Sequence, residues 1–121
     1  MYGAALGDMI GAPYEFDRGE KTKDFPLFTA ESTYTDDTVM TVAVAEALMD
    51  SEGESDKETQ KCIAETMLRW GRKYPKAGYS AQYLRWLFKD HKPLDVDTVD
   101  AAMSISCIGL LYDTIDETRK M

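Results

Sequence analysis

The sequence predicts an all-α protein, and three observations carry this prediction. Apolar residues recur at helical spacing between about residues 36 and 50. Ser55 and Glu58 form a Ser-x-x-Glu capping box, which marks the start of a further helix. No run of residues alternates between apolar and polar as a half-buried strand would. With 121 residues, 44% of them hydrophobic, the chain is expected to form one domain over residues 1–121.

The first expected helix runs from Tyr2 to Ile10, where the residues are small and apolar. Gly11, Ala12 and Pro13 end it, because glycine and proline interrupt helices. From Tyr14 to Tyr34 the apolar residues show no helical or strand periodicity, so a long surface loop is predicted there. Loops of this length are often functional.

The remaining expected helices share apolar residues at helical spacing and recognisable boundaries. Tyr74 and Pro75 stop the helix that begins at the capping box. The expected ranges are residues 36–50, 55–74, 80–89, about 98–111, and a short acidic turn of helix at 114–119.

The charge excludes some classes of protein. The 14 Lys and Arg residues against 22 Asp and Glu residues give a net charge of −8, which disfavours binding to nucleic acid or to an anionic membrane surface.

Cys62 and Cys107 lack metal-ligand spacing and are expected to be reduced thiols. Without a signal-peptide pattern or a long apolar stretch, we expect a soluble, cytoplasmic protein.

The densest chemical signal is Thr35-Asp36-Asp37-Thr38, at the entrance to the best-defined helix. Carboxylates and hydroxyls supply the hard oxygen ligands that suit Mg²⁺ or Ca²⁺. The same residue types also cap helices and favour the positive end of the helix dipole. On spacing alone, the capping interpretation is the favoured one.

Two further acids stand in unusual places. Glu15 follows a helix end in a constrained turn, where it could act as a general base or contact a metal, although an ordinary exposed glutamate is the favoured interpretation of that residue alone. Asp8 lies among apolar residues of the first helix. It is either an acceptor for backbone N–H groups or part of a site, and the structural role is favoured.

The segment from Tyr74 to Ser80 places a glycine and two aromatic rings before a helix. Backbone amides in such a place can hold phosphate, and a plain helix connection is an equally good interpretation. His91, the only histidine, is better explained as a cation at a helix C-terminus than as a ligand or base.

In combination these segments resemble the ADP-ribosylglycohydrolase family, which includes the dinitrogenase-reductase-activating glycohydrolases. Residues 3–16, GAALGDMIGAPYEF, resemble the family's opening segment. Residues 34–41, YTDDTVMT, are similar to its first metal-binding motif, and residues 74–80 with Trp86 and Leu87 are similar to its third landmark. The motif order and approximate spacing match over about residues 1–90.

The resemblance implies an all-α fold around one or two Mg²⁺ ions that hydrolyses the bond joining ADP-ribose to a protein side chain or small acceptor. It implies that Glu15 is the acid near the metal and the scissile bond. It also favours the metal interpretation of the Thr35 motif over the capping interpretation. The remaining implied site residues are the metal ligands Thr35, Asp36 and Asp37, and Gly78, Tyr79 and Ser80 at the ADP-ribose phosphates.

Two departures from the family pattern shape the functional expectation. The family's Asn-Gly-Ser-Ala-Met-Arg segment reads VDAAMS at residues 99–104, where Asp100 would repel a diphosphate. Family members are about twice this length, with a second Asp-x-Asp-Thr metal motif near the C-terminus. Residues 95–98, DVDT, have the right letters, but we expect a loop and helix cap there.

We therefore expect the chain to correspond to the N-terminal half of a glycohydrolase. Its ancestral activity would be Mg²⁺-dependent removal of ADP-ribose, and a single chain is not expected to be competent. The alternative is a non-catalytic acidic module of phage or mobile-element origin that binds a protein as an inhibitor or decoy. A third possibility is a fragment without an independent role. Apolar faces left uncovered would favour a homodimer.

Overall fold

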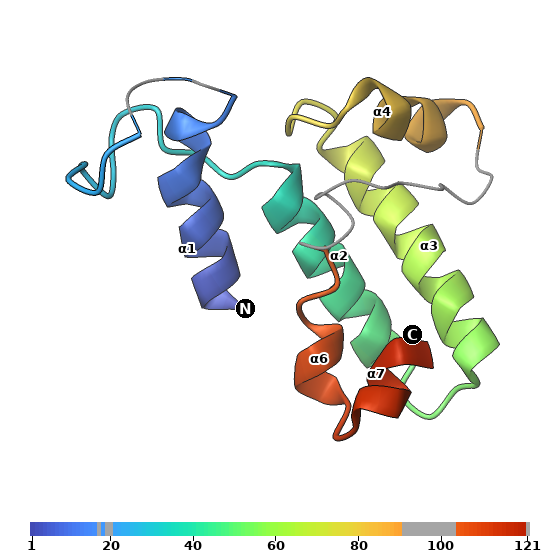
Figure 1. The fold of residues 1–121 in the computed structure, drawn as a ribbon. Helices are drawn as coiled ribbons and strands as arrows, with labels where there is room; N and C mark the ends of the chain where they lie inside the picture. The colour runs from blue at the N-terminus through green and yellow to red at the C-terminus, as the bar shows by residue number, and fades with distance from the viewer. Residues whose placement is uncertain (17, 19–20, 91–103, 121) are drawn as a thin grey trace.

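The computed structural model describes residues 1–16, 18, 21–90 and 104–120. All regular structure within these residues is helical, which confirms the all-α prediction (Figure 1). In the same residues, no helix is both long enough and apolar enough to cross a membrane. The helices are α1 (Tyr2–Gly11), the 3₁₀ helix η1 (Ala12–Tyr14), α2 (Asp36–Asp50), α3 (Asp56–Lys73), α4 (Ala81–Phe88), α6 (Ile108–Leu111) and α7 (Ile115–Lys120).

The predicted helix boundaries hold where capping residues define them. Helix α2 has the expected bounds, and Thr35 caps it by accepting a hydrogen bond from the Asp37 backbone N–H. Both hydrogen bonds of the Ser55 and Glu58 capping box are present at the start of α3. The side chain of Ser80 caps α4. Local side-chain to backbone hydrogen bonds therefore set the starts of the three central helices.

The helix expected at residues 98–111 is not continuous. Residues 98–103, like His91 and the DVDT stretch, lie outside the described residues, but residues 105–107 form a turn and α6 begins only at Ile108. The run from Ser104 to Cys107 contains serine, isoleucine and cysteine, all of which have weaker helix propensity than leucine or alanine. The prediction of one helix through this turn was wrong for that reason.

Helices α2 and α3 form an antiparallel pair, the most extensive helix contact among the residues that the structure describes (Figure 1). One core cluster, where α4 packs beside the N-terminal half of α2, contains Val39, Met40, Tyr79, Tyr83, Trp86 and Leu87. A second cluster joins the C-terminal half of α2 to the α6 region and contains Val44, Ala45, Leu48, Cys107 and Ile108. Both cysteines are free thiols. Both halves of α2 therefore contribute to the core.

Helix α1 is attached to the start of α2 through one buried carboxylate. Asp8, which is 7% exposed, accepts hydrogen bonds from the Thr35 backbone N–H at 2.8 Å and from the Thr35 hydroxyl at 2.7 Å. It also accepts hydrogen bonds from the backbone N–H and the hydroxyl of Thr38. The interpretation of Asp8 as a structural acceptor is confirmed, and its partners are the residues that begin α2.

The α3–α4 contact depends on a glycine. A Cβ atom at Gly71 would lie 2.4 Å from Cδ2 and 2.9 Å from Cδ1 of Leu87. Leu87 is completely buried in the core, so a shift of its side chain away from the new methyl group would disturb the packing of its neighbours. We expect Gly71→Ala to lower the free energy of unfolding by about 1–3 kcal/mol through overpacking, measured by urea denaturation.

Gly7→Ala in α1 is the matched control, because no atom lies within 4 Å of the added Cβ. The same gain in helix propensity should make this variant neutral, or more stable by about 0.5–1 kcal/mol. Equal effects of the two substitutions would contradict the close packing of Gly71 against Leu87.

Asp8→Ala would remove the acceptor shared by four donors at the start of α2. Since buried unsatisfied donors are costly, we expect the free energy of unfolding to fall by about 2–4 kcal/mol, measured in chelator to exclude metal effects. Asp24→Ala, in the exposed loop, should change it by less than about 0.5 kcal/mol. A loss at Asp8 no larger than that of the control would contradict the attachment of α1 described above.

A candidate metal centre in an acidic and basic cavity

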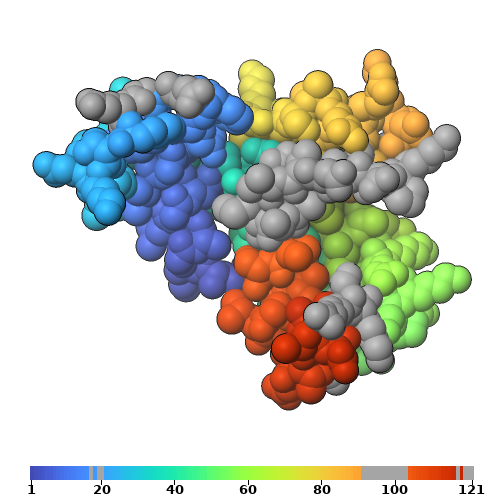
Figure 2. All heavy atoms as spheres, in the orientation of Figure 1, coloured from blue at the N-terminus to red at the C-terminus, as the bar shows by residue number. Residues whose placement is uncertain are grey.

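A cavity of about 1040 Å³ lies at the start of α2. Three segments line it: residues 12–16 with Arg18, parts of residues 29–37 before and at the start of α2, and residues 73–78 with Ser80 at the end of α3 and in the α3–α4 connection. In Figure 2 the blue segment that follows α1 and the yellow segment that precedes α4 lie on either side of the top of the molecule. Residues far apart in the sequence therefore meet around one space.

Three carboxylates come together beside the cavity. Oxygen atoms of Asp8, Glu15 and Asp37 all lie within 4.8 Å of one another. Asp8 comes from α1, Glu15 follows η1, and Asp37 lies in the first turn of α2. Oxygen ligands on opposite sides of one Mg²⁺ or Ca²⁺ ion are about 4–5 Å apart, so the three groups fit around a single cation. Without a cation, three such close negative charges would disfavour one another.

Backbone geometry holds Glu15 in this position. Pro13 lies at the start of η1, and the carbonyl oxygen of Glu15 accepts a hydrogen bond from the Arg18 N–H at 2.9 Å. Phe16 has a φ of 51°, which is rare and strained for a bulky residue. The chain therefore turns sharply just after Glu15. The strain at Phe16 supports a defined position for Glu15 rather than a freely moving surface side chain.

The other two predicted metal ligands flank the cluster. The Thr35 hydroxyl donates to Asp8 and accepts from the Asp37 N–H, so Thr35 supports the cluster and caps α2 at once. The Asp36 N–H donates to the Ala77 carbonyl at 2.9 Å. Oδ1 of Asp36 lies 3.2 Å from the position of a Cβ atom at Gly78. Asp36 thus lies against the α3–α4 connection, on the other side of the α2 start from Asp8.

The three residues expected at the phosphates have different surroundings. Gly78 and Ser80 line the cavity, and Gly78 has a φ of +117° that favours glycine. The Ser80 hydroxyl accepts a hydrogen bond from the Tyr83 N–H at 3.2 Å. Tyr79 instead belongs to the core, and its hydroxyl has no hydrogen-bond partner among the described residues. Burial raises the pKa of Tyr79 far above its usual range, with smaller contributions from Asp36 and Tyr34, so its phenol is neutral.

Asp8 is the residue of the cluster that the sequence did not assign to a metal. The sequence did contain an indication of this role, because a carboxylate among the apolar residues of a helix needs either hydrogen-bond donors or a cation. The structure places it where it can meet both needs. Among the hydrogen bonds that Thr35 and Thr38 donate, Oδ2 accepts three and Oδ1 accepts one, which leaves Oδ1 the less occupied oxygen.

Comparison with known proteins identifies the family of the chain. The family model described as ADP-ribosylglycohydrolase matches residues 1–121. The uncharacterized protein YegU of Escherichia coli (strain K12) is 28% identical over 142 aligned positions, which cover 96% of this chain and 42% of YegU. The chain therefore spans less than half the length of that relative, and no solved structure matches it. The match over the whole chain establishes that the protein belongs to the ADP-ribosylglycohydrolase family.

Proposed function

We propose that this chain provides a divalent-cation site and part of the substrate cavity for the hydrolysis of an ADP-ribosyl bond. The observation that carries the proposal is the meeting of Asp8, Glu15 and Asp37 within 4.8 Å beside a cavity of about 1040 Å³. Three carboxylates from separate helical segments form a hard oxygen donor set, which suits Mg²⁺. The family membership supports the same chemistry.

In this proposal Asp8 and Asp37 hold the cation, with Thr35 and Asp36 fixing the backbone around them. A bound Mg²⁺ ion would orient ribose oxygens and lower the pKa of water. Glu15 accepts a proton from the attacking water at the edge of the cluster. In the overall reaction water adds to the anomeric carbon of the ribose, the bond to the acceptor breaks, and the acceptor leaves with a proton.

Substitution of the cluster tests both binding and turnover. We expect Asp37→Asn to weaken Mg²⁺ binding at least about tenfold in calorimetry, because one anionic ligand is lost. Glu15→Gln should lower the release of ADP-ribose from modified arginine or serine substrates by about 10²–10⁴-fold, because the proton acceptor is lost. Because a single chain is not expected to be competent, the activity assay also contains an excess of any second polypeptide that turnover requires.

Asp56→Asn is the matched control, since Asp56 also lies in the first turn of a helix and substitution costs the same helix-dipole interaction. It should leave both measurements unchanged. Failure of the unsubstituted protein to bind Mg²⁺ or Mn²⁺ at millimolar concentration would contradict the proposed metal site.

A second candidate function is a protein-binding module, and exposed apolar side chains near the end of the chain favour it. Ile105, Leu110, Leu111 and Ile115 are each more than half exposed. Exposed apolar residues gathered in one segment commonly mark an interface. We expect a homodimer in size-exclusion chromatography with light scattering, and Leu110→Ser with Ile115→Ser should shift it to monomer. A monomeric unsubstituted protein at micromolar concentration would contradict the dimer.

A further inference from the structure

We propose that the loop tip formed by residues 25–28, Phe-Pro-Leu-Phe, docks the polypeptide of an acceptor protein and favours ADP-ribosylated side chains that have apolar neighbours. The tip lies in the long segment between η1 and α2, and its residues do not line the cavity. The inference rests on the proposed function, since it concerns the group to which the ADP-ribose is attached.

The tip places consecutive apolar side chains in solvent. Leu27 and Phe28 are 59% and 56% exposed, and Phe25 is also exposed. In Figure 2 the light-blue loop that contains the tip projects beyond α1. Consecutive exposed apolar residues are unfavourable on a protein surface unless they have a function, and they commonly mark a site of interaction.

Hydrogen bonds on both sides of the tip hold its backbone. The Asp24 N–H donates to the Thr22 hydroxyl at 3.1 Å before the tip. After the tip, the Thr29 N–H donates to the Ser32 hydroxyl at 3.0 Å, and the Glu31 N–H donates to the Thr29 hydroxyl at 3.2 Å. The apolar side chains are therefore presented by an ordered backbone, which lowers the entropy lost when a partner binds.

Tyr14 connects the tip to the candidate site. Its ring lies edge to face against Phe25, with the ring centroids 5.2 Å apart, and its hydroxyl donates to the Pro26 carbonyl at 3.3 Å. Lys21 in turn donates to the backbone carbonyl of Tyr14. Tyr14 lines the cavity and directly precedes Glu15. The tip therefore has a defined place relative to the proton acceptor of the proposed reaction.

The tip is also continuous with the edge of the cavity. Thr29, which directly follows Phe28, lines the cavity, as do Phe16 and Arg18 just after Glu15. Since the scissile bond lies at Glu15 in the proposed function, the acceptor lies beyond this edge. A small acceptor inside the cavity would not touch the tip, whereas the chain of an acceptor protein would pass over it.

The chemistry of the tip indicates which acceptor sequences it favours. Leu27 and Phe28 offer only apolar contacts. Lys23 and Asp24 beside the tip have opposite charges, so this surface has no net preference for an acidic or a basic segment. Apolar side chains next to the modified residue therefore match the tip best, because their burial against Leu27 and Phe28 removes apolar surface from water on both sides.

Fluorescence anisotropy with two labelled peptides in saturating Mg²⁺ tests the inference. Each peptide carries one ADP-ribosylated arginine, flanked by leucine and phenylalanine in one peptide and by serines in the other. We expect the unsubstituted protein to bind the apolar peptide about 5- to 30-fold more tightly, the range for important apolar contacts at interfaces. Leu27→Ser and Phe28→Ser should each reduce this preference, without changing the affinity for free ADP-ribose.

Met49→Ser is the matched control, because Met49 is an exposed apolar residue at the end of α2 and does not line the cavity. It should leave the preference unchanged. Equal affinities of the unsubstituted protein for the two peptides, or an undiminished preference in both loop variants, would overturn this inference alone if free ADP-ribose still binds.

Other occupants of the tip give different results. Binding of the unsubstituted protein to phosphatidylcholine vesicles that Phe28→Ser abolishes would assign the tip to a lipid surface and overturn the inference. A change of oligomeric state in either loop variant would assign the tip to a second copy of the chain and also overturn it. Failure of the unsubstituted protein to bind free ADP-ribose and both peptides would instead overturn the proposed function, and the inference with it.

Discussion

The candidate site depends on the hydrogen bonds that the carboxylate of Asp8 accepts. This carboxylate accepts hydrogen bonds from Thr35 and Thr38 and so joins α1 to the first turn of α2. That joint brings Glu15, which follows α1 and η1, to Asp37, which lies in α2. A buried carboxylate needs several donors or a cation to offset its lost hydration, and Asp8 lies where both are within reach. One residue therefore couples the packing of α1 to the chemistry proposed for the cavity.

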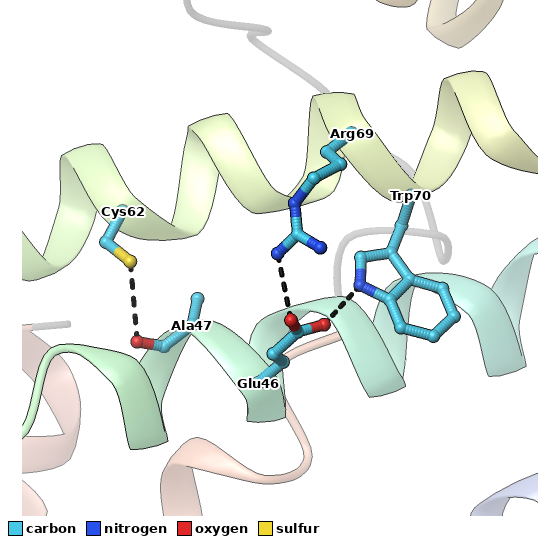
Figure 3. Close-up of polar contacts among 5 residues, drawn as sticks. All are labelled: Glu46, Ala47, Cys62, Arg69 and Trp70. Carbon is cyan, nitrogen blue, oxygen red and sulfur yellow. Dashed lines mark hydrogen bonds and ion pairs between the residues drawn. The ribbon is translucent and has the colours of Figure 1, made fainter.

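The cavity also explains how a strongly acidic protein could hold an anionic ligand. Overall repulsion counts against phosphate binding by a chain of net charge −8. Three of the negative groups at this site form a cluster that a divalent cation would partly neutralise, and the cavity lining also contains Arg18, Lys73 and Lys76. The net charge of the chain does not show this local arrangement of charges, which decides what kind of ligand the cavity attracts. The indole N–H of Trp70 donates to Glu46 and so ties the end of α3, where Lys73 lies, to α2 (Figure 3).

Local signals in the sequence predicted much of the fold. The Thr35 cap and the Ser55 capping box placed the starts of α2 and α3 because capping depends on neighbouring residues alone. The turn at residues 105–107 was missed because periodicity was given more weight than weak helix propensity. The resemblance to a family supplied Glu15 and Asp37, whereas the proximity of Asp8 to both arises from helix packing that spacing does not encode. The burial of Tyr79 likewise depends on how α4 packs against α2.

The most direct test of the central claim is the location of a bound ion. Mn²⁺ is a suitable substitute for Mg²⁺ at oxygen sites and is visible by its anomalous scattering in a crystal. Crystals grown with Mn²⁺ should show an anomalous peak in contact with oxygen atoms of Asp8 and Asp37 and beside the carboxylate of Glu15, with Thr35 still bonded to Asp8. Saturating Mn²⁺ with no peak among the three carboxylates, or a peak bound by other residues only, would contradict the proposed metal centre.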